Sequence, residues 1–271
     1  MSKTIIIDAG HGGIDSGAVG FNKKEKDWTL TISRYQYKRL TELGAKVALT
    51  RNADTTLSPT QRIAKIKNQY DICISNHWNA FDGNGRGIET IHSVKAKPDF
   101  ANDLANRLKQ TTNLPLRRVF HRTTSPGVDY YFLHRLTGRT ETVIIEYGFI
   151  DHAQDHAYYN DEANIYKAAE AVLEGICKNL GIHYVHSTNQ TVSKKDGLSG
   201  RVESIHHGHL RFYKRPSWKD EDVFGYLTFG QGFTKVLEKV KVGSGKQYKV
   251  ANARGEVFYV TASPTYVKLI H

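Results

Sequence analysis

Short apolar runs alternate with helical patterns along the N-terminal part of the chain. The apolar runs cover residues 4–8, 46–50, 71–76, 88–93 and 142–147, and helical patterns cover 60–70, 99–110 and 162–180. A further helical pattern follows Lys26, with Trp28, Ile32 and Leu40 on one face, and stops at Gly44. Strands that alternate with helices form a sheet with helices packed on it. We therefore expect an α/β domain with a mostly parallel sheet flanked by helices.

The alternation stops after Gly181. The stretch 186–197 is polar, rich in small residues and without an apolar period, which is typical of a linker. Beyond it, short aromatic and β-branched runs between Gly, Pro and Ser turns predict a small all-β barrel. A chain of 271 residues is long enough for two domains. We expect domains at 1–183 and 200–271, joined by a linker at 184–199.

The charge of the chain indicates what kind of partner it has. There are 38 Lys and Arg against 27 Asp and Glu, a net charge of +11. Such an excess favours a polyanionic partner, which includes nucleic acid, an anionic membrane face and an acidic polymer. Charged residues interrupt every apolar run before the roughly 18 residues that a membrane helix needs, so no membrane span is expected. The apolar run after Met1 is too short for a signal peptide, and we expect synthesis in a cytoplasm.

Residues with ligand and acid–base chemistry stand at the ends of three predicted strands. These residues are His11, His77 and Glu146. Because the carboxyl ends of parallel strands meet at one edge of a sheet, we expect the three side chains to lie close together. Glu25 stands at the start of the first predicted helix, where it could face the same edge.

This set of residues matches the needs of a hydrolytic zinc site. Such a site has three nitrogen or oxygen ligands, an open position for water, and a separate carboxylate that takes the proton of the water. Each residue alone has an ordinary explanation, since a histidine at a strand end is often structural and Glu25 suits a helix N-terminus. Their joint appearance, with Gly10 and Gly12 allowing close backbone approach around His11, favours the metal site.

Five motifs occur in a fixed order along the first domain. They are Asp8-Ala9-Gly10-His11-Gly12-Gly13-Ile14-Asp15-Ser16-Gly17-Ala18, Glu25-Lys26-Asp27, Ser75-Asn76-His77-Trp78-Asn79-Ala80, Gly87-Ile88-Glu89 and Val143-Ile144-Ile145-Glu146-Tyr147-Gly148-Phe149. Together they resemble the zinc-dependent N-acetylmuramoyl-L-alanine amidase family of the type 3 class. The resemblance implies that His11, Glu25 and His77 bind Zn²⁺. It also implies that Glu146 is the catalytic carboxylate and that the enzyme cuts the amide bond between N-acetylmuramic acid and L-alanine in peptidoglycan.

The chain departs from the family pattern near two of these motifs. It has Asn76-His77-Trp78 where the family usually has Ile-His-Ala, and Trp78 is expected to add an aromatic wall to the substrate groove. It has Asp151 after the last motif where the family usually has Asn, and Asp151 is expected to change how the loop after Glu146 is held. The remaining candidates for groups that orient the ligands or contact the substrate are Asp8, Asn79 and Glu89, and ordinary strand-end hydrogen bonding stays open for Asp8 and Glu89.

Other enzyme classes find no support. Asp15 stands where the third glycine of a dinucleotide-binding turn belongs, and it would repel a pyrophosphate. No phosphate-binding Gly-Lys-Ser or Gly-Lys-Thr sequence follows a strand, and the Gly-x-Ser-x-Gly pattern of serine hydrolases is absent around Ser16.

The second domain is basic and rich in aromatic residues. Residues 201–271 contain 12 Lys and Arg against 6 Asp and Glu, a net charge of +6. Stretches at 210–217, 223–227 and 247–250 resemble a bacterial SH3-like cell-wall-binding domain, which implies binding to peptidoglycan or to an anionic cell-wall polymer. Binding of nucleic acid through Lys, Arg and aromatic side chains is the non-enzymatic alternative, and we do not expect it to be the function.

An amidase joined by a linker to a wall-binding domain, without a signal peptide, resembles a phage endolysin. We therefore expect an enzyme that reaches the cell wall after holin-type release and causes host lysis. A host autolysin is the alternative.

Overall fold

The computed structural model describes residues 3–187, 200–252 and 255–270. The chain divides into two compact units, Met1–Gln190 and Thr191–His271. Residues 188–199, which make up most of the expected linker, lie outside the described residues. Each unit has a hydrophobic core of its own. None of the helices in the described ranges has the length and apolar character to cross a membrane.

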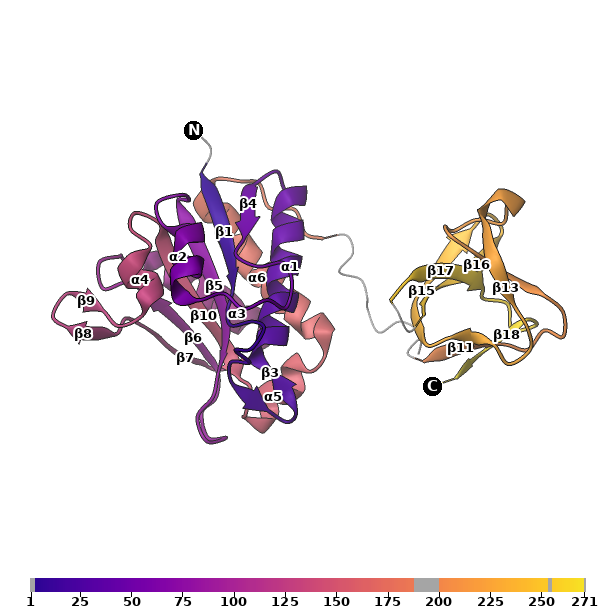
Figure 1. Ribbon diagram of the computed structural model, residues 1–271, viewed down its shortest axis with the longest axis horizontal. Coiled ribbons are helices and arrows are strands. Elements are labelled where there is room, and N and C mark those ends of the chain that lie inside the picture. The colour runs from indigo at the N-terminus through magenta and orange to yellow at the C-terminus, as the bar shows by residue number, and fades with distance from the viewer. Residues whose placement is uncertain (1–2, 188–199, 253–254, 271) are drawn as a thin grey trace. The chain divides into compact units, whose positions relative to one another are not determined.

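The first unit is built on a six-stranded sheet with the order β4-β1-β5-β10-β6-β7 (Figure 1). Its strands are β1 (Thr4–Ala9), β4 (Lys46–Leu49), β5 (Ile72–Asn79), β6 (Ile88–His92), β7 (Leu116–Phe120) and β10 (Glu141–Phe149). Four neighbouring pairs are parallel, and the pair of β10 and β6 is antiparallel. The sheet is therefore mixed, with β6 and β7 running against the other four strands.

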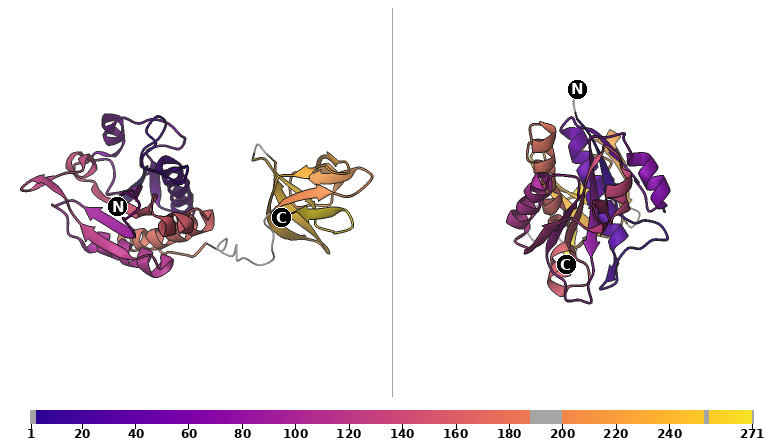
Figure 2. Two further views of the ribbon diagram at one scale, coloured as in Figure 1. Left: turned by 90° about the horizontal axis from the view of Figure 1, so that it is seen from below. Right: turned by 90° about the vertical axis from the view of Figure 1, so that its left-hand side faces the viewer.

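Helices cover both faces of this sheet (Figures 1 and 2). They are α1 (Glu25–Glu42), α2 (Pro59–Ile66), α3 (Asp99–Thr112), α4 (Phe132–Leu136), α5 (Ala153–Tyr159) and α6 (Glu162–Leu180). Two short hairpins complete the unit, β2 (Val19–Gly20) with β3 (Lys23–Lys24) and β8 (Thr123–Ser125) with β9 (Val128–Asp129).

Side chains of the central strands alternate between the two helical layers. Ile5 and Ile74 belong to the core formed with α1, α3 and α6, whereas Ile6 and Cys73 belong to the core formed with α2 and α4. Successive residues of a strand point to opposite faces, so a strand that is covered on both faces needs a continuous apolar run. This explains why β1 and β5 each contain a continuous apolar run before their polar ends, at 5–7 and 72–74. Helix α1 ends at Glu42, and Gly44 then adopts a φ of 80°, a left-handed conformation that suits glycine.

The second unit is all β, as the sequence predicted for this part of the chain. It contains a three-stranded sheet of order β14-β11-β18 and a five-stranded sheet of order β13-β12-β17-β16-β15. The elements are β11 (Arg201–Ser204), β12 (Leu210–Tyr213), β13 (Val223–Leu227), β14 (Gly232–Phe233), β15 (Lys235–Val242), β16 (Gly245–Ala251), β17 (Val257–Thr261), β18 (Val267–Ile270) and the 3-10 helix Asp220–Asp222. The paired strands of this unit are antiparallel to one another. Val202, Val250 and Val260 are fully buried in its core.

Candidate metal centre and active site

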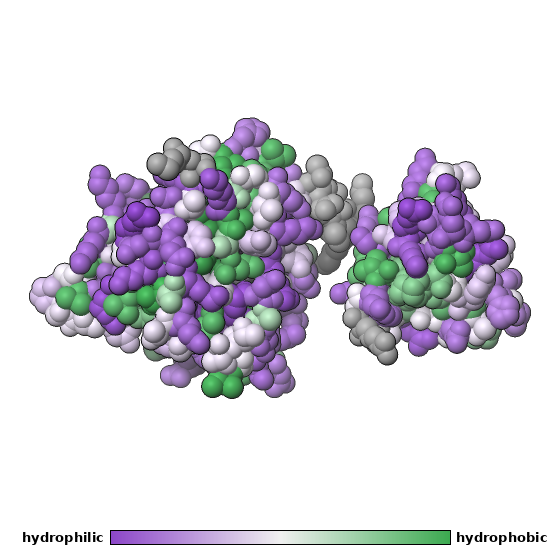
Figure 3. All heavy atoms as spheres, turned by 45° about the horizontal axis from the view of Figure 1, so that its top comes forward, coloured by the Kyte–Doolittle hydropathy of each residue, from purple (hydrophilic) through white to green (hydrophobic). Residues whose placement is uncertain are grey.

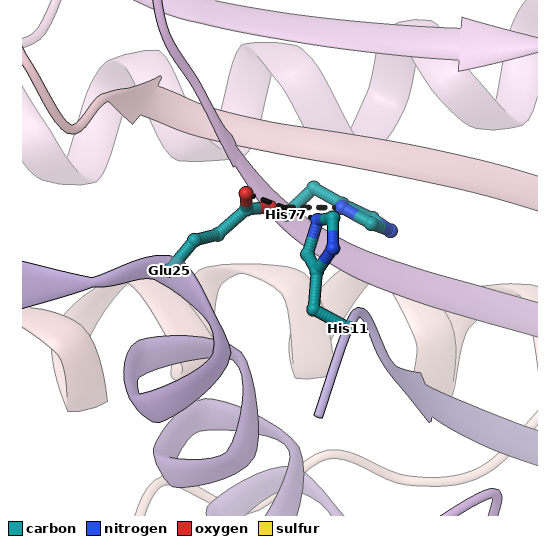
Figure 4. A group of neighbouring side chains, drawn as sticks. All are labelled: His11, Glu25 and His77. Atoms are coloured by element: carbon teal, nitrogen blue, oxygen red, sulfur yellow. Dashed lines mark hydrogen bonds and ion pairs between the residues drawn. The ribbon is translucent and has the colours of Figure 1, made fainter. Parts of the chain in front are cut away.

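Three side chains that the sequence proposed as metal ligands converge near the carboxyl ends of β1 and β5 (Figure 4). His11 lies two residues after β1, Glu25 is the first residue of α1, and His77 belongs to β5. One ligand-type atom from each residue lies within 4.8 Å of those of the other two. Glu25 Oε2 is 3.0 Å from His11 Nε2, and Glu25 Oε1 is 2.9 Å from His77 Nδ1.

The donor set fits a zinc ion. Imidazole nitrogen and carboxylate oxygen bind zinc at about 2.0–2.2 Å, which puts two ligands of a tetrahedral site about 3.4 Å apart. The separations on either side of Glu25, 3.0 and 2.9 Å, are somewhat shorter than that value, and one ligand-type atom from each residue lies within 4.8 Å of the others. Glu25 is 3% exposed, and its burial raises the pKa of the carboxyl, but hydrogen bonds with His11 and His77 outweigh burial and lower the pKa to about 2. The carboxylate is therefore ionised at neutral pH, as a metal ligand must be.

Further contacts fix the orientation of two of these side chains. Glu25 Oε1 accepts a hydrogen bond from the backbone N–H of Trp78 at 3.0 Å, and Oε2 accepts one from the backbone N–H of Ala18 at 2.8 Å. His11 Nδ1 lies 2.9 Å from Asp15 Oδ2. A carboxylate on the far nitrogen is the usual partner of a metal-binding imidazole. Asp15 is thus a site residue that the sequence did not reveal.

Glu146 lies beside the three candidate ligands on the neighbouring strand. In the parallel pair of β10 and β5, Glu146 is in register with His77. Its Oε2 atom is buried and has no hydrogen-bond partner within the described ranges. Burial and, after it, the charges of Glu25 and Glu89 raise the pKa of Glu146 well above its usual range. The same surroundings make the ionised Glu146 carboxylate a stronger base than an exposed glutamate.

Glu89 and Asn79, two further polar candidates from the sequence, belong to one cluster with two arginines. In the antiparallel pair of β10 and β6, Glu89 is in register with Glu146. Glu89 Oε1 accepts hydrogen bonds from Arg117 and, at 2.8 Å, from Arg118. Glu89 Oε2 accepts one from Asn79 Nδ2 at 3.1 Å. The sequence drew attention to the carboxylate but not to the arginines.

Two other candidates are buried. The Asp8 carboxylate is fully buried and pairs with Arg62, whose guanidinium also donates to the backbone carbonyl of His11 at 2.9 Å. Trp78 is 1% exposed, and its indole stacks on Tyr147 with 4.9 Å between ring centres. The expectation that Trp78 forms a wall of the substrate groove is therefore wrong. Neighbouring residues of a strand point to opposite faces, so a strand that presents His77 to the site sends Trp78 into the core.

Asp151 joins the loop after β10 to the loop after β5, because its Oδ2 accepts hydrogen bonds from the backbone N–H groups of Phe81 and Gly83, both at 2.9 Å. Burial and, after it, the charge of Glu146 raise the pKa of the Tyr131 phenol. No motif indicated Tyr131, because it comes from the short helical region around α4.

Comparisons with known proteins point to one family. The model of the N-acetylmuramoyl-L-alanine amidase family matches residues 5–178. The uncharacterized protein YqiI of Bacillus subtilis (strain 168) is 34% identical over 178 residues, which are 64% of this chain and 83% of YqiI. The endolysin of Bacillus phage SPP1 is 26% identical over 98% of each chain. The catalytic domain of CwlV, an N-acetylmuramoyl-L-alanine amidase from Bacillus (Paenibacillus) polymyxa var. colistinus, is 28% identical with a TM-score of 0.60, over 67% of this chain and 99% of that domain.

Proposed function

The chain belongs to the N-acetylmuramoyl-L-alanine amidase family, and on this basis we propose that it is a zinc-dependent hydrolase of the amide bond between N-acetylmuramic acid and L-alanine in peptidoglycan. The observation that carries the proposal is the convergence of His11, Glu25 and His77 beside Glu146. Two imidazoles and a carboxylate, with a second carboxyl on the adjacent strand, are the groups that a hydrolytic zinc site needs. The likeness to the CwlV catalytic domain supports the choice of bond.

In this proposal His11, Glu25 and His77 hold the metal, and Glu146 transfers the proton. A zinc ion, when bound, makes a water molecule more acidic and polarises a carbonyl group. Glu146 accepts the proton of the attacking water and returns it to the nitrogen of the departing alanine. The raised pKa of Glu146 lets the carboxyl keep that proton between the two events. Without the proton the alanine nitrogen is a poor leaving group, and the attacking oxygen would depart instead.

The second unit is proposed to hold the enzyme on the cell wall, through peptidoglycan or an anionic wall polymer. Residues 201–271 carry a net charge of +6, and large aromatic side chains such as Trp218, Phe224 and Phe229 are exposed. Figure 3 shows an apolar area among hydrophilic residues on one face of this unit. The similarity to the SPP1 endolysin over 98% of both chains supports a role in phage lysis of the host after holin-type release.

Digestion of purified peptidoglycan followed by mass spectrometry tests the proposed reaction. The expected product is peptide with a new N-terminal L-alanine, beside intact glycan strands. New reducing sugar ends would instead indicate a glycosidase, and new amino groups within the peptides would indicate an endopeptidase.

Metal analysis tests the ligand assignment. The purified protein is expected to contain one zinc per chain, and His77→Ala is expected to lose the zinc and the activity because two ligands hold the ion poorly. His121→Ala is the matched control, since His121 is exposed and lies outside the group of candidate ligands. Stoichiometric zinc and full activity in His77→Ala would show that the assignment is wrong.

A further inference from the structure

Two arginines reach the site from β7, the strand at the edge of the sheet. The pairing of β6 with β7 has an irregularity, because Ile88 is in register with Leu116 but Glu89 is in register with Arg118. Arg117 is thus an extra residue opposite the partner strand, which is the definition of a β-bulge. A bulge re-aims side chains, and here Arg117 and Arg118 both donate to Oε1 of Glu89 although they are consecutive in a strand.

The arginine pair carries more positive charge than Glu89 neutralises. Glu89 is 1% exposed, whereas the side chains of Arg117 and Arg118 are 39% and 50% exposed. One buried carboxylate therefore holds two guanidinium groups that face solvent, with one positive charge in excess. A guanidinium has five N–H donors in a planar fork, which suits a carboxylate. The Arg118 guanidinium also lies 4.0 Å over the ring of Phe120, which holds its orientation.

The arginines lie in line with the proposed reacting groups. His77, Glu146, Glu89 and Arg118 occupy matching register positions on β5, β10, β6 and β7. Neighbouring strands are about 4.8 Å apart, so the backbone of Arg118 lies about 10 Å beyond that of Glu146, on the side away from His77. An extended peptide spans about 3.3–3.6 Å per residue. Arg118 is therefore within reach of the second or third residue of a peptide that starts at Glu146.

The direction of the substrate follows from the proposed function, on which this inference rests. If the carbonyl of the cut bond faces the candidate ligands and Glu146 protonates the alanine nitrogen, the departing peptide extends from Glu146 towards β7. We propose that Arg117 and Arg118, positioned by Glu89, bind a free carboxylate on the second or third residue of the peptide that is attached through L-alanine. A carboxamide at the same place has no charge, and it gains less from the arginine pair.

The test compares kcat/KM on soluble N-acetylmuramoyl peptides that differ by one group. Each peptide begins with L-alanine and carries a free carboxylate at its second residue, a free carboxylate at its third residue, or carboxamides at both. The wild-type enzyme is expected to favour one of the acidic substrates over the amidated one by about tenfold or more, mainly through KM. Arg118→Gln is expected to bring this ratio close to one, and Arg118→Lys to give an intermediate ratio because it keeps the charge without the fork.

Controls separate this effect from general damage to the fold. Arg139→Gln removes a positive charge from the turn before β10, where Arg139 Nε donates to the backbone carbonyl of Asn68 at 3.1 Å, and it should keep the wild-type ratio. Arg117→Gln is a second variant, which keeps the hydrogen bond between Arg118 and Glu89. It should also lower the preference for the acidic substrate. Thermal unfolding of each variant shows whether it is folded.

The outcomes are distinguishable. A wild-type ratio near one, or a wild-type ratio that persists in folded Arg118→Gln, overturns the inference and leaves the proposed function intact. If the wild-type enzyme cuts none of the substrates, the proposed function fails, and calorimetry then measures binding of the same peptides. Acid-selective binding that Arg118→Gln removes still supports the carboxylate site, and equal binding of acidic and amidated peptides rejects it.

Discussion

Glu146 is a carboxyl group whose surroundings favour its protonated form. Glu146→Gln keeps the size of the side chain but cannot transfer a proton, so we expect kcat on soluble muropeptides to fall about 10²- to 10⁴-fold. Zinc content should stay at the wild-type level, because Glu146 lies outside the group of candidate ligands. Glu141→Gln, at the other end of β10, is the control and should retain activity. Wild-type kcat in a folded, zinc-loaded Glu146→Gln enzyme would remove Glu146 from the catalytic role.

His134 makes the stability of the first unit depend on pH. It is 8% exposed, and burial lowers its pKa to about 4 although the charge of Asp129 opposes this shift. In the unfolded chain the pKa is about 6.5, so between these values the unfolded state binds a proton that the folded state does not. The contribution of neutral His134 is complete above about pH 6.5 and is lost progressively as the pH falls towards 4.

We therefore expect acid to lower the free energy of unfolding of the first unit through His134, by up to about 3 kcal/mol between pH 6.5 and 4. Urea unfolding at several pH values measures this loss. His134→Gln does not titrate in this range, and its stability should fall less steeply with pH. The same slope in His134→Gln and in the wild type would rule out His134 as the source.

The gathering of the three candidate ligands could be predicted, because strand ends and motifs mark them in the sequence. The residues that hold His11 and Glu89 in place could not be predicted from the sequence. Asp15 reaches His11 through a turn in which Gly12 and Asp15 exchange two backbone hydrogen bonds, and Arg117 reaches Glu89 through a bulge. Turns and bulges of this kind leave no period in the sequence. By contrast, successive side chains of β5 face opposite sides of the sheet, so the position of Trp78 next to His77 already indicated that Trp78 packs in the core.

Helices α1 and α6 are joined by a buried ion pair. Arg39 Nε lies 2.8 Å from Glu170 Oε1, and the two side chains are 9% and 5% exposed. Arg39→Met leaves the Glu170 carboxylate buried without its cation, so we expect the first unit to lose about 3 kcal/mol of stability. Lys38→Met is the control on the same helix, since its pair with Glu42 is exposed at 3.8 Å and is worth less than about 1 kcal/mol. Urea unfolding measures both, and equal losses would contradict the prediction.

The elements with strong periodicity were predictable, whereas β7 and the direction of β6 were missed. Strand β7 reads Leu-Arg-Arg-Val-Phe, and its two central charges hide it because it is an edge strand with an exposed side. The chain between β5 and β6, residues 80–87, is shorter than the ten to twelve residues or so that a parallel crossover needs. That length was a usable sign that β6 runs antiparallel to β5.

The two units are expected to divide binding and chemistry between them. A fragment of residues 198–271 should bind purified cell walls without cutting them, and residues 1–183 should cut soluble muropeptides but lyse cells poorly. The reason is effective concentration, because a second module keeps the catalytic unit near an insoluble polymer. Part of the wall affinity should fall with added salt, since the net charge of +6 is screened over about 8 Å at physiological ionic strength.

A pull-down of the 198–271 fragment with purified walls across a salt series measures this binding, and duplex DNA serves as the control. Contacts through aromatic side chains should persist at high salt, so binding should weaken without disappearing. Tight DNA binding with no wall binding would contradict the two-module proposal and favour the nucleic-acid alternative.

The candidate ligands stand at positions 11, 25 and 77, on segments that only the folded chain brings together. A metal ion held by all three would tie the carboxyl ends of β1 and β5 and the start of α1 to one another, and the unfolded chain cannot offer the same site. Free ion at 100 times its dissociation constant then adds about 2.7 kcal/mol to the free energy of unfolding. If the proposed ion binds there, the supply of metal in the surroundings would set how long the first unit withstands proteases, as well as how fast it works.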